Sequence, residues 1–303
     1  MDSTDRDPIQ SSAGVRDLRD VACLLASGPD ARAWLNGQIT QQLAFLEPGR
    51  AAYGLAVNVK GRILSDLWVS TTTHDALRIA VPADRRDALR THLAKYIVME
   101  DVELSDDDRA IVTVQGPAAA AITRDLPGCE VLAAPRLHPD GRDVVCAPGD
   151  REAVSALLTS RATELGGGPI DDAAWALAHV RRGIPRYGVD FDESSYPQEA
   201  GLEDRAVSFE KGCYLGQEVV CMLQNRGQLR RRLVQLHAEG PLEVGGELAK
   251  DDAALGAVTS AAPDPSGGWV ALGYVKRASA EIGARLDRPA PCSIVAIVGD
   301  ATK

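Results

Sequence analysis

The chain has 303 residues, which is enough for about two domains and a sizeable hydrophobic core. Hydrophobic residues make up 45% of it and charged residues 25%, values typical of globular proteins rather than of disordered or low-complexity chains. The 33 Lys and Arg residues against 43 Asp and Glu give a net charge of −10. This charge would repel a nucleic-acid backbone, so we expect no direct nucleic-acid partner.

Neither a targeting signal nor a membrane span is visible in the sequence. The first ten residues, MDSTDRDPIQ, are acidic and polar, and no apolar run approaches the roughly 20 residues of a membrane-spanning helix. We therefore expect a cytoplasmic protein without a membrane partner. The six cysteines lack CxxC spacing, which favours free thiols in a reducing compartment, and the five histidines lack the spacing of zinc ligands, so no metal site is expected.

The first half of the chain predicts a mixed α+β structure in which helices and strands do not alternate strictly. Apolar residues recur at helical spacing between Pro29 and Pro48, which predicts a helix there. Two apolar runs on either side of Gly61 predict a hairpin over residues 51–70, because glycine readily adopts the positive φ of a tight turn. Further strands are expected at 77–81, near 102 and at 111–114, and a helix at 83–96. The four tryptophans fall in apolar patterns and are expected in the core.

The second half predicts helices followed by a region of short strands. A helix over 150–165 ends at the glycine run 166–168, which we interpret as a flexible connection, and Asp171 is expected to cap the next helix. From residue 229 onward, short apolar runs alternate with Gly, Pro and Asp, a pattern typical of a small antiparallel barrel. We therefore predict an α+β region over 1–228 and a C-terminal β-barrel domain over 229–303.

The segment with the most chemical content is KGCYLGQE, residues 211–218. Its two glycines allow the backbone to approach a ligand, and a thiol, a phenol, an amide and a carboxylate lie close together in the sequence. Lys211 is two residues from Cys213, and a nearby cation favours the nucleophilic thiolate. A buried, purely structural cysteine explains the spacing equally well, so both interpretations stay open.

This octamer closely resembles the KGCYxGQE signature of the YgfZ family of folate-binding proteins, which includes an iron-sulfur assembly branch and is related to the glycine-cleavage T-protein. LNGQIT at 35–40 resembles the family's LxGQxT element, and Asn58 with KGRI at 60–63 resembles its hairpin motif. GIP at 183–185 and PQE at 197–199 precede the octamer in the usual order. The resemblance implies two intertwined α+β subdomains followed by a small β-barrel, arranged around a central ligand hole.

The resemblance also implies tetrahydrofolate or a derivative as the cofactor and identifies candidate site residues. The expected folate-binding residues are Asn58, Lys211, Gly212, Tyr214, Gly216, Gln217, Glu218 and Arg226. Cys213 and Asp66 are the candidate catalytic residues. Cys213 carries the thiol of the signature, and Asp66 falls in the region where the T-protein has the acidic group that handles the substrate amine.

Departures from the family patterns bear on the function. Residues 179–182 replace a usual Arg-Ile-Glu-Ala, Cys221-Met222 replaces a usual small residue and arginine, and no GYTGE-like stretch, the pterin-gripping element of the T-protein, is present near 140–142. These departures favour a folate-binding accessory protein for assembly or maintenance of iron-sulfur clusters in client enzymes, including tRNA-modification enzymes. The alternative is a tetrahydrofolate-dependent aminomethyltransferase, and a folate-binding protein with a structural Cys213 is a third. On the first interpretation, Asp66 is not an obligatory catalytic residue.

Overall fold

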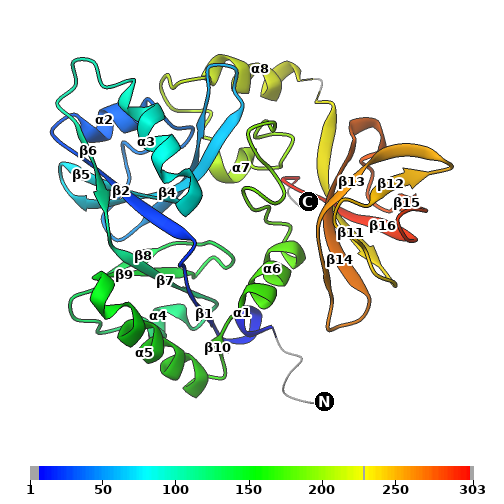
Figure 1. Cartoon of the computed structure of the whole chain (residues 1–303), viewed down its shortest axis with the longest axis horizontal. Helices are drawn as coiled ribbons and strands as arrows, with labels where there is room; N and C mark the ends of the chain where they lie inside the picture. Colours follow the sequence, from blue (N-terminus) through cyan, green and yellow to red (C-terminus); the bar gives the residue numbers. More distant parts are fainter. Residues whose placement is uncertain (1–6, 228, 301–303) are drawn as a thin grey trace.

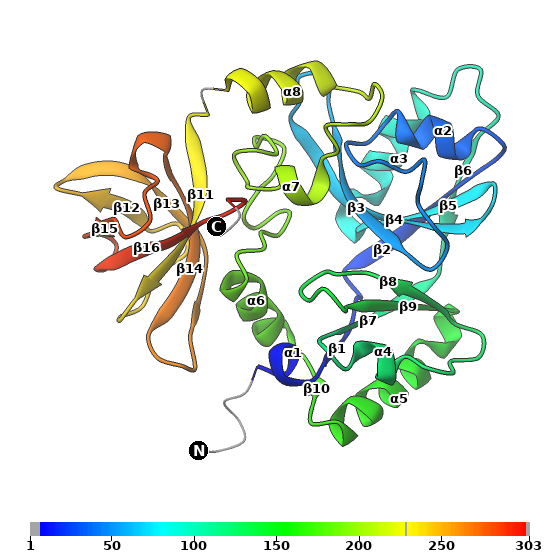
Figure 2. The same cartoon turned by 180° about the vertical axis from the view of Figure 1, so that it is seen from behind.

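The computed structural model describes residues 7–227 and 229–300, apart from the side chain of Arg226, and contains three sheets (Figures 1 and 2). Two sheets and their helices form the first part of the chain, and the third sheet forms a separate lobe. This arrangement confirms the predicted α+β class and the C-terminal barrel-like sheet. The boundary between 228 and 229 stays a proposal.

The first sheet is antiparallel, with strand order β3-β4-β5-β2-β6. Its strands are β2 (Val21–Ser27), β3 (Ala51–Val57), β4 (Ile63–Thr73), β5 (Ala76–Pro82) and β6 (Glu103–Asp107). Helices α2 (Ala31–Asn36) and α3 (Arg86–Ala94), the latter preceded by the short η2 (Ala83–Arg85), pack their apolar residues against this sheet. The predicted hairpin is confirmed, with Gly61 in its turn at φ +72°.

The second sheet has strand order β10-β1-β7-β9-β8 and is antiparallel except for the pair of β1 with β10. Its strands are β1 (Gly14–Asp17), β7 (Ala110–Gln115), β8 (Glu130–Ala133), β9 (Arg142–Cys146) and β10 (Gly168–Pro169). The flanking helices are α1 (Pro8–Ser11), α4 (Ala119–Ile122), η3 (Pro148–Asp150) and α5 (Arg151–Glu164). The chain enters this sheet at β1, crosses to the first sheet at β2 and returns at β7, so the two subdomains are intertwined.

The third sheet lies entirely within the C-terminal lobe, with strand order β12-β13-β14-β11-β16-β15. Its strands are β11 (Arg231–Ala238), β12 (Glu247–Lys250), β13 (Ala253–Pro263), β14 (Trp269–Lys276), β15 (Arg285–Leu286) and β16 (Cys292–Ile297), with η4 (Arg277–Ser279) between β14 and β15. A bridge between Ala249 and Arg288 brings the two edges together, so the sheet is nearly closed around its own apolar core.

The segment between the lobes holds α6 (Asp172–Arg181), α7 (Glu203–Ala206) and α8 (Gln217–Arg226). The side chain of Asp171 accepts a hydrogen bond from the Ala174 N–H, which confirms the predicted cap of α6. Val180 on α6 packs against Leu233 and Leu272 of the third sheet. Helix α6 therefore lies between the barrel and the two intertwined subdomains (Figure 2).

Two local predictions were wrong. Helix α2 ends at Asn36, and Ile39 and Leu43 are buried in the core beyond its end rather than on a helical face. The glycine run is not a free connection, because Gly168 pairs with Gly14 in the second sheet. No helix in the described residues has the length and apolar character needed to cross a membrane.

Candidate ligand-binding site

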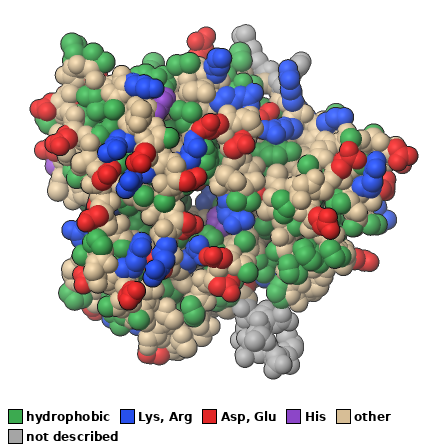
Figure 3. Space-filling view, viewed as in Figure 1, with side chains coloured by type: hydrophobic (Ala, Val, Ile, Leu, Met, Phe, Trp, Pro, Cys, Tyr) green, Lys and Arg blue, Asp and Glu red, His purple; other side chains and the backbone are tan. Residues whose placement is uncertain are grey.

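A cavity of about 300 Å³ lies where the two intertwined subdomains meet α6 and the residues that follow it. Figure 3 shows the molecule hollowed near the centre of this face, with basic, acidic and histidine side chains around the hollow. A second cavity of about 560 Å³ shares Tyr53, Trp68, Ile184 and Arg205 with the first. The first volume is at the lower end of the range for small-molecule sites, and the second extends it.

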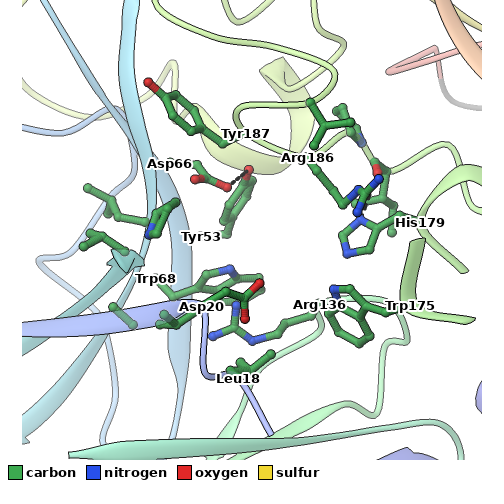
Figure 4. Close-up of a pocket in the computed structure, with 18 of the residues that line it drawn as sticks. Leu18, Asp20, Tyr53, Asp66, Trp68, Arg136, Trp175, His179, Arg186 and Tyr187 are labelled. Carbon is green, nitrogen blue, oxygen red and sulfur yellow. Dashed lines mark hydrogen bonds between the residues drawn. The ribbon is translucent and has the colours of Figure 1, made fainter. Parts of the chain in front are cut away.

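Aromatic side chains give the cavity flat apolar surfaces. Tyr53 on β3 is directly opposite Trp68 on β4, and their ring centroids are 5.1 Å apart. On α6, Trp175 and His179 are also in contact, at 5.1 Å between centroids. A planar ligand could therefore pack against aromatic rings from either side of the opening (Figure 4).

Asp66 places a carboxyl group with a buried, unpaired oxygen atom in the cavity wall. Successive side chains of a strand alternate between faces, so Asp66 and Trp68 share the cavity face of β4. The Tyr53 hydroxyl donates to Asp66 Oδ2 over 3.0 Å, while the buried Oδ1 has no partner among the described residues. Burial raises the pKa of Asp66 to about 6, an effect that the Tyr53 hydrogen bond and Arg136 only partly oppose. This carboxyl group can therefore gain or lose a proton near neutral pH.

Three arginines line the same cavity, with different partners. Arg136 forms a bidentate ion pair with the buried Asp143, with Nη2 and Oδ2 2.7 Å apart. Arg205 donates to two backbone carbonyls of the loop after β8. The Nε of Arg186 is buried and has no acceptor among the described residues. Arg136 is thus fixed by a carboxylate, whereas the other two are not.

His179 presents a neutral imidazole to the cavity. Its Nδ1 is 3.0 Å from the carbonyl oxygen of Ile184, so Nδ1 must carry the proton and Nε2 is left as an acceptor. Burial, reinforced by the nearby arginines, lowers the pKa of His179 to about 3. The ring therefore stays uncharged at neutral pH.

The octamer 211–218 does not line either cavity. The Lys211 ammonium group is buried and donates to the carbonyls of Asn36, Ile39 and Gln41 over 2.5, 2.8 and 2.8 Å. Its burial lowers the pKa of Lys211 to about 8. Lys211 therefore ties the octamer to the chain that leaves α2.

The rest of the octamer and the hairpin residue Asn58 also lie away from the cavity. Cys213 is exposed, Tyr214 is buried in an apolar cluster, and Gly216 adopts φ +79° against the Asn58 carbonyl. The Asn58 side chain accepts two backbone N–H groups and so holds the turn of the hairpin. Gly212 and Glu218 are exposed and Gln217 is half-buried, while the side chain of Arg226 lies outside the described residues. Among the predicted site residues that are described, Asp66 alone lines the cavity, and the binding roles of the others stay predictions.

Sequence reasoning missed most of the residues that line the cavity. Trp68 and Trp175 were expected in the core, and their rings do pack in apolar clusters while also facing the opening. His179 stood out as a departure from a family pattern, but nothing in its spacing linked it to Asp66. The alternation of Asp66 and Trp68 on one strand face was the local signal available. Among the described residues, no group of three or more His, Cys, Asp or Glu side chains is placed to hold a metal ion.

Comparison with known proteins gives consistent similarities over most of the chain. Residues 4–134 match the family model described as the GCVT N-terminal domain. The aminomethyltransferase of Streptomyces avermitilis is 29% identical over 309 residues, covering 91% of this chain and 81% of the relative. The aminomethyltransferase of Rubrobacter xylanophilus is 26% identical over 321 residues, covering 96% and 84%. The crystal structure of glycine cleavage system aminomethyltransferase T from Bartonella henselae has a TM-score of 0.83 at 22% identity, covering 95% of this chain and 86% of that one.

These similarities support a glycine-cleavage T-protein-like chain and overturn the expected iron-sulfur role. The two relatives and the solved structure described above are named aminomethyltransferases, so the comparisons favour the alternative expectation over an accessory protein for iron-sulfur clusters. They give no support for iron-sulfur clients or for tRNA-modification enzymes. The narrower resemblance to YgfZ rests on the octamer and the shorter motifs at 35–40, 58–63, 183–185 and 197–199, and the comparisons do not test it.

Proposed function

We propose that this protein is an aminomethyltransferase that passes a one-carbon unit to tetrahydrofolate bound in the cavity beside Asp66. The observation that carries the proposal is the position of the Asp66 carboxyl group, which has one buried, unpaired oxygen. It lies beside aromatic side chains in a cavity whose volume suits a small planar ligand. The similarity to aminomethyltransferases supports the reaction class.

The residues present fit a reduced folate. A pterin is flat and carries N–H groups that need acceptors, which Asp66 Oδ1 and His179 Nε2 can supply from opposite sides of the opening. When bound, the folate supplies the nitrogen that accepts the carbon unit. Its longer tail would extend into the second cavity, which shares four wall residues with the first.

Asp66 is the residue to which we assign proton handling. Because burial brings its pKa to about 6, the carboxyl exchanges a proton near neutral pH more readily than an exposed aspartate. Tyr53 donates to Oδ2 and so directs the free Oδ1 to the ligand. We thus replace the expectation that Asp66 is dispensable with the proposal that it is required. Cys213 has no part in this reaction, and the YgfZ resemblance of its octamer stays a prediction.

The test is single-turnover transfer from a chemically prepared aminomethyl donor to tetrahydrofolate. In Asp66→Asn, transfer should slow by about 100-fold or more, the typical contribution of a positioned acid or base, while tetrahydrofolate affinity changes only a few-fold. The exposed Asp75→Asn serves as the matched control and should retain full activity. Unimpaired transfer in Asp66→Asn, or wild-type protein that binds no tetrahydrofolate at millimolar concentration, would refute the proposal.

A further inference from the structure

Two cavity arginines lack an ionic partner. Among residues 7–227 and 229–300, no carboxylate lies within ion-pair distance of Arg186 or Arg205, although both line the cavity. An arginine cannot lose its proton, and a partly buried charge without a counter-ion is costly. The neighbouring Arg136 already has its carboxylate in Asp143. Two positive charges therefore remain available for an anion.

The two arginines reach the cavity from different positions, because the guanidinium of Arg205 lies 5.8 Å from the ring centroid of Tyr53 on β3. Arg186 and Arg205 both act on the imidazole of His179 and lower its pKa, in addition to the larger effect of burial. Figure 4 shows His179 and Arg186 across the opening from Asp66 and Trp68. Arg186 therefore lies across the opening from the carboxyl group of Asp66, while Arg205 lies beside Tyr53, which donates a hydrogen bond to that carboxyl group.

The remaining acidic residues at the cavity do not cancel the two arginines. Asp20 and Asp84 also line it, but both are exposed, and Asp20 is 3.6 Å from Arg16. Charges that are open to water are screened more strongly than partly buried ones. Asp66 is protonated over part of the pH range because burial raises its pKa to about 6.

We propose that Arg186 and Arg205, which line the same cavity without an ionic partner among the described residues, form a carboxylate-binding subsite in it. This inference rests on the proposed function and deepens it. The ligand must carry a carboxylate that the arginines bind and a nitrogen that lies near Asp66. A guanidinium group binds a carboxylate through two parallel N–H donors, and the unpaired Nε of Arg186 is one such donor. The carboxylate can come from the glutamate tail of the folate or from an amino acid that acts as the amine donor. Arg205 lines both cavities and is reached by either.

Calorimetric titration of the full chain with paired probes tests the subsite. Tetrahydrofolate is compared with tetrahydropterin, which has no carboxylate, and sarcosine with dimethylamine. In Arg186→Gln and Arg205→Gln, the carboxylate-bearing member of one pair should bind about 10 to 100 times more weakly, because a charged hydrogen bond usually contributes this much. The affinity of its carboxylate-free counterpart should change less than about twofold. A loss for tetrahydrofolate identifies the tail as the source, and a loss for sarcosine identifies an amino-acid donor. Arg90→Gln, which removes one exposed positive charge far from the cavity lining, should change none of these affinities.

Other outcomes overturn the subsite. It is wrong if both members of a pair weaken equally, if neither weakens, or if the wild-type chain shows no preference for the carboxylate in either pair. Arg186→Lys guards against a folding artefact, because it keeps the charge and loses the fork, and its loss should be smaller than that of Arg186→Gln. Unchanged affinity of both glutamine variants for tetrahydrofolate and for sarcosine would refute the subsite alone. Failure of the wild-type chain to bind any pterin would instead refute the proposed function, and the sarcosine pair would still test the arginines.

Discussion

At the residue scale, the protonation of Asp66 links the stability of the protein to its proposed reaction. The folded-state pKa of about 6 exceeds the ordinary value of 3.8, so the folded protein holds this proton more tightly than the unfolded chain. The resulting stabilisation is complete below about pH 4 and is lost as the pH rises through 6. Asp66→Asn removes this dependence. Relative to wild type, its free energy of unfolding should therefore increase by about 2–3 kcal/mol between pH 4 and pH 7.5.

Urea unfolding of both proteins at the two pH values measures this difference. The exposed Asp75→Asn again serves as the control and should show no comparable change. A difference between wild type and Asp66→Asn that does not vary with pH would contradict the raised pKa.

Cys213 gives a second prediction at this scale, independent of any function. Its thiol is exposed, whereas Cys23 is 1% exposed and burial raises the pKa of its thiol to about 12. Alkylation requires the thiolate form and access of the reagent to the sulfur. An alkylating reagent should therefore label Cys213 much faster than the buried Cys23, Cys146 and Cys292. Mass spectrometry of peptides after timed labelling checks the order. Equal rates would mean that the Cys213 thiol is not exposed as described.

Single residues of the site could be predicted from sequence only where a known pattern covered them. Asp66 was found through its position in a resembling hairpin, and it does line the cavity. Arg186 and Arg205 were not, because the cavity is assembled from segments that are distant in sequence and ordinary in composition. For Lys211 the known pattern predicted a folate-binding residue, but Lys211 does not line the cavity. Its ammonium group is used on three backbone carbonyls, a contact that no local spacing reveals.

At the scale of elements, patterns of apolar residues predicted strands and helices well but not the end of α2. Ile39 and Leu43 continue the apolar spacing of α2, yet they reach the core from an irregular segment that Lys211 holds through the Ile39 carbonyl. Similarly, one glycine of the run 166–168 is required by close packing, although a Cβ at Gly166 or Gly168 would meet nothing within 4 Å. A Cβ at Gly167 would lie 2.1 Å from the Ala13 carbonyl oxygen. Close packing and flexibility leave the same signature in a sequence.

The two glycines of the octamer differ in whether close packing requires them. Gly216 has φ +79°, and a Cβ there would be 2.4 Å from the Asn58 carbonyl oxygen, whereas a Cβ at Gly212 would meet nothing within 4 Å. Gly216→Ala should therefore lower the free energy of unfolding by about 2–4 kcal/mol, through backbone strain and the steric clash together. Gly212→Ala, the matched control, should change it by less than about 0.5 kcal/mol. Chemical denaturation measures both, and equal effects would argue against the packing of the octamer on the hairpin.

At the scale of the whole molecule, the barrel supports one wall of the cavity through α6. Trp175 and His179 face the cavity from this helix, and its apolar residue Val180 packs on the third sheet. The Arg181 guanidinium pairs with Asp264 of the barrel and holds the pKa of that carboxyl well below its usual range. The C-terminal lobe thus contributes to the site without supplying a residue that lines the first cavity in the described part of the chain.

Gln235 of the barrel gives the sharpest test of this support. Its side-chain amide donates to the carbonyls of Val180 and Arg181 over 2.7 and 2.9 Å, at the end of α6 where helix carbonyls lack partners of their own. Gln235→Met keeps the length of the side chain but removes both donors, which should lower the free energy of unfolding by about 1–3 kcal/mol. Because α6 also positions Trp175 and His179, tetrahydrofolate should bind several-fold more weakly, although Gln235 itself does not line the cavity. The control is Gln42→Met, whose side chain serves only a local turn, and it should leave ligand affinity unchanged. If Gln235→Met destabilises the protein while ligand affinity stays at the wild-type value, the barrel stabilises the fold but does not position the cavity wall.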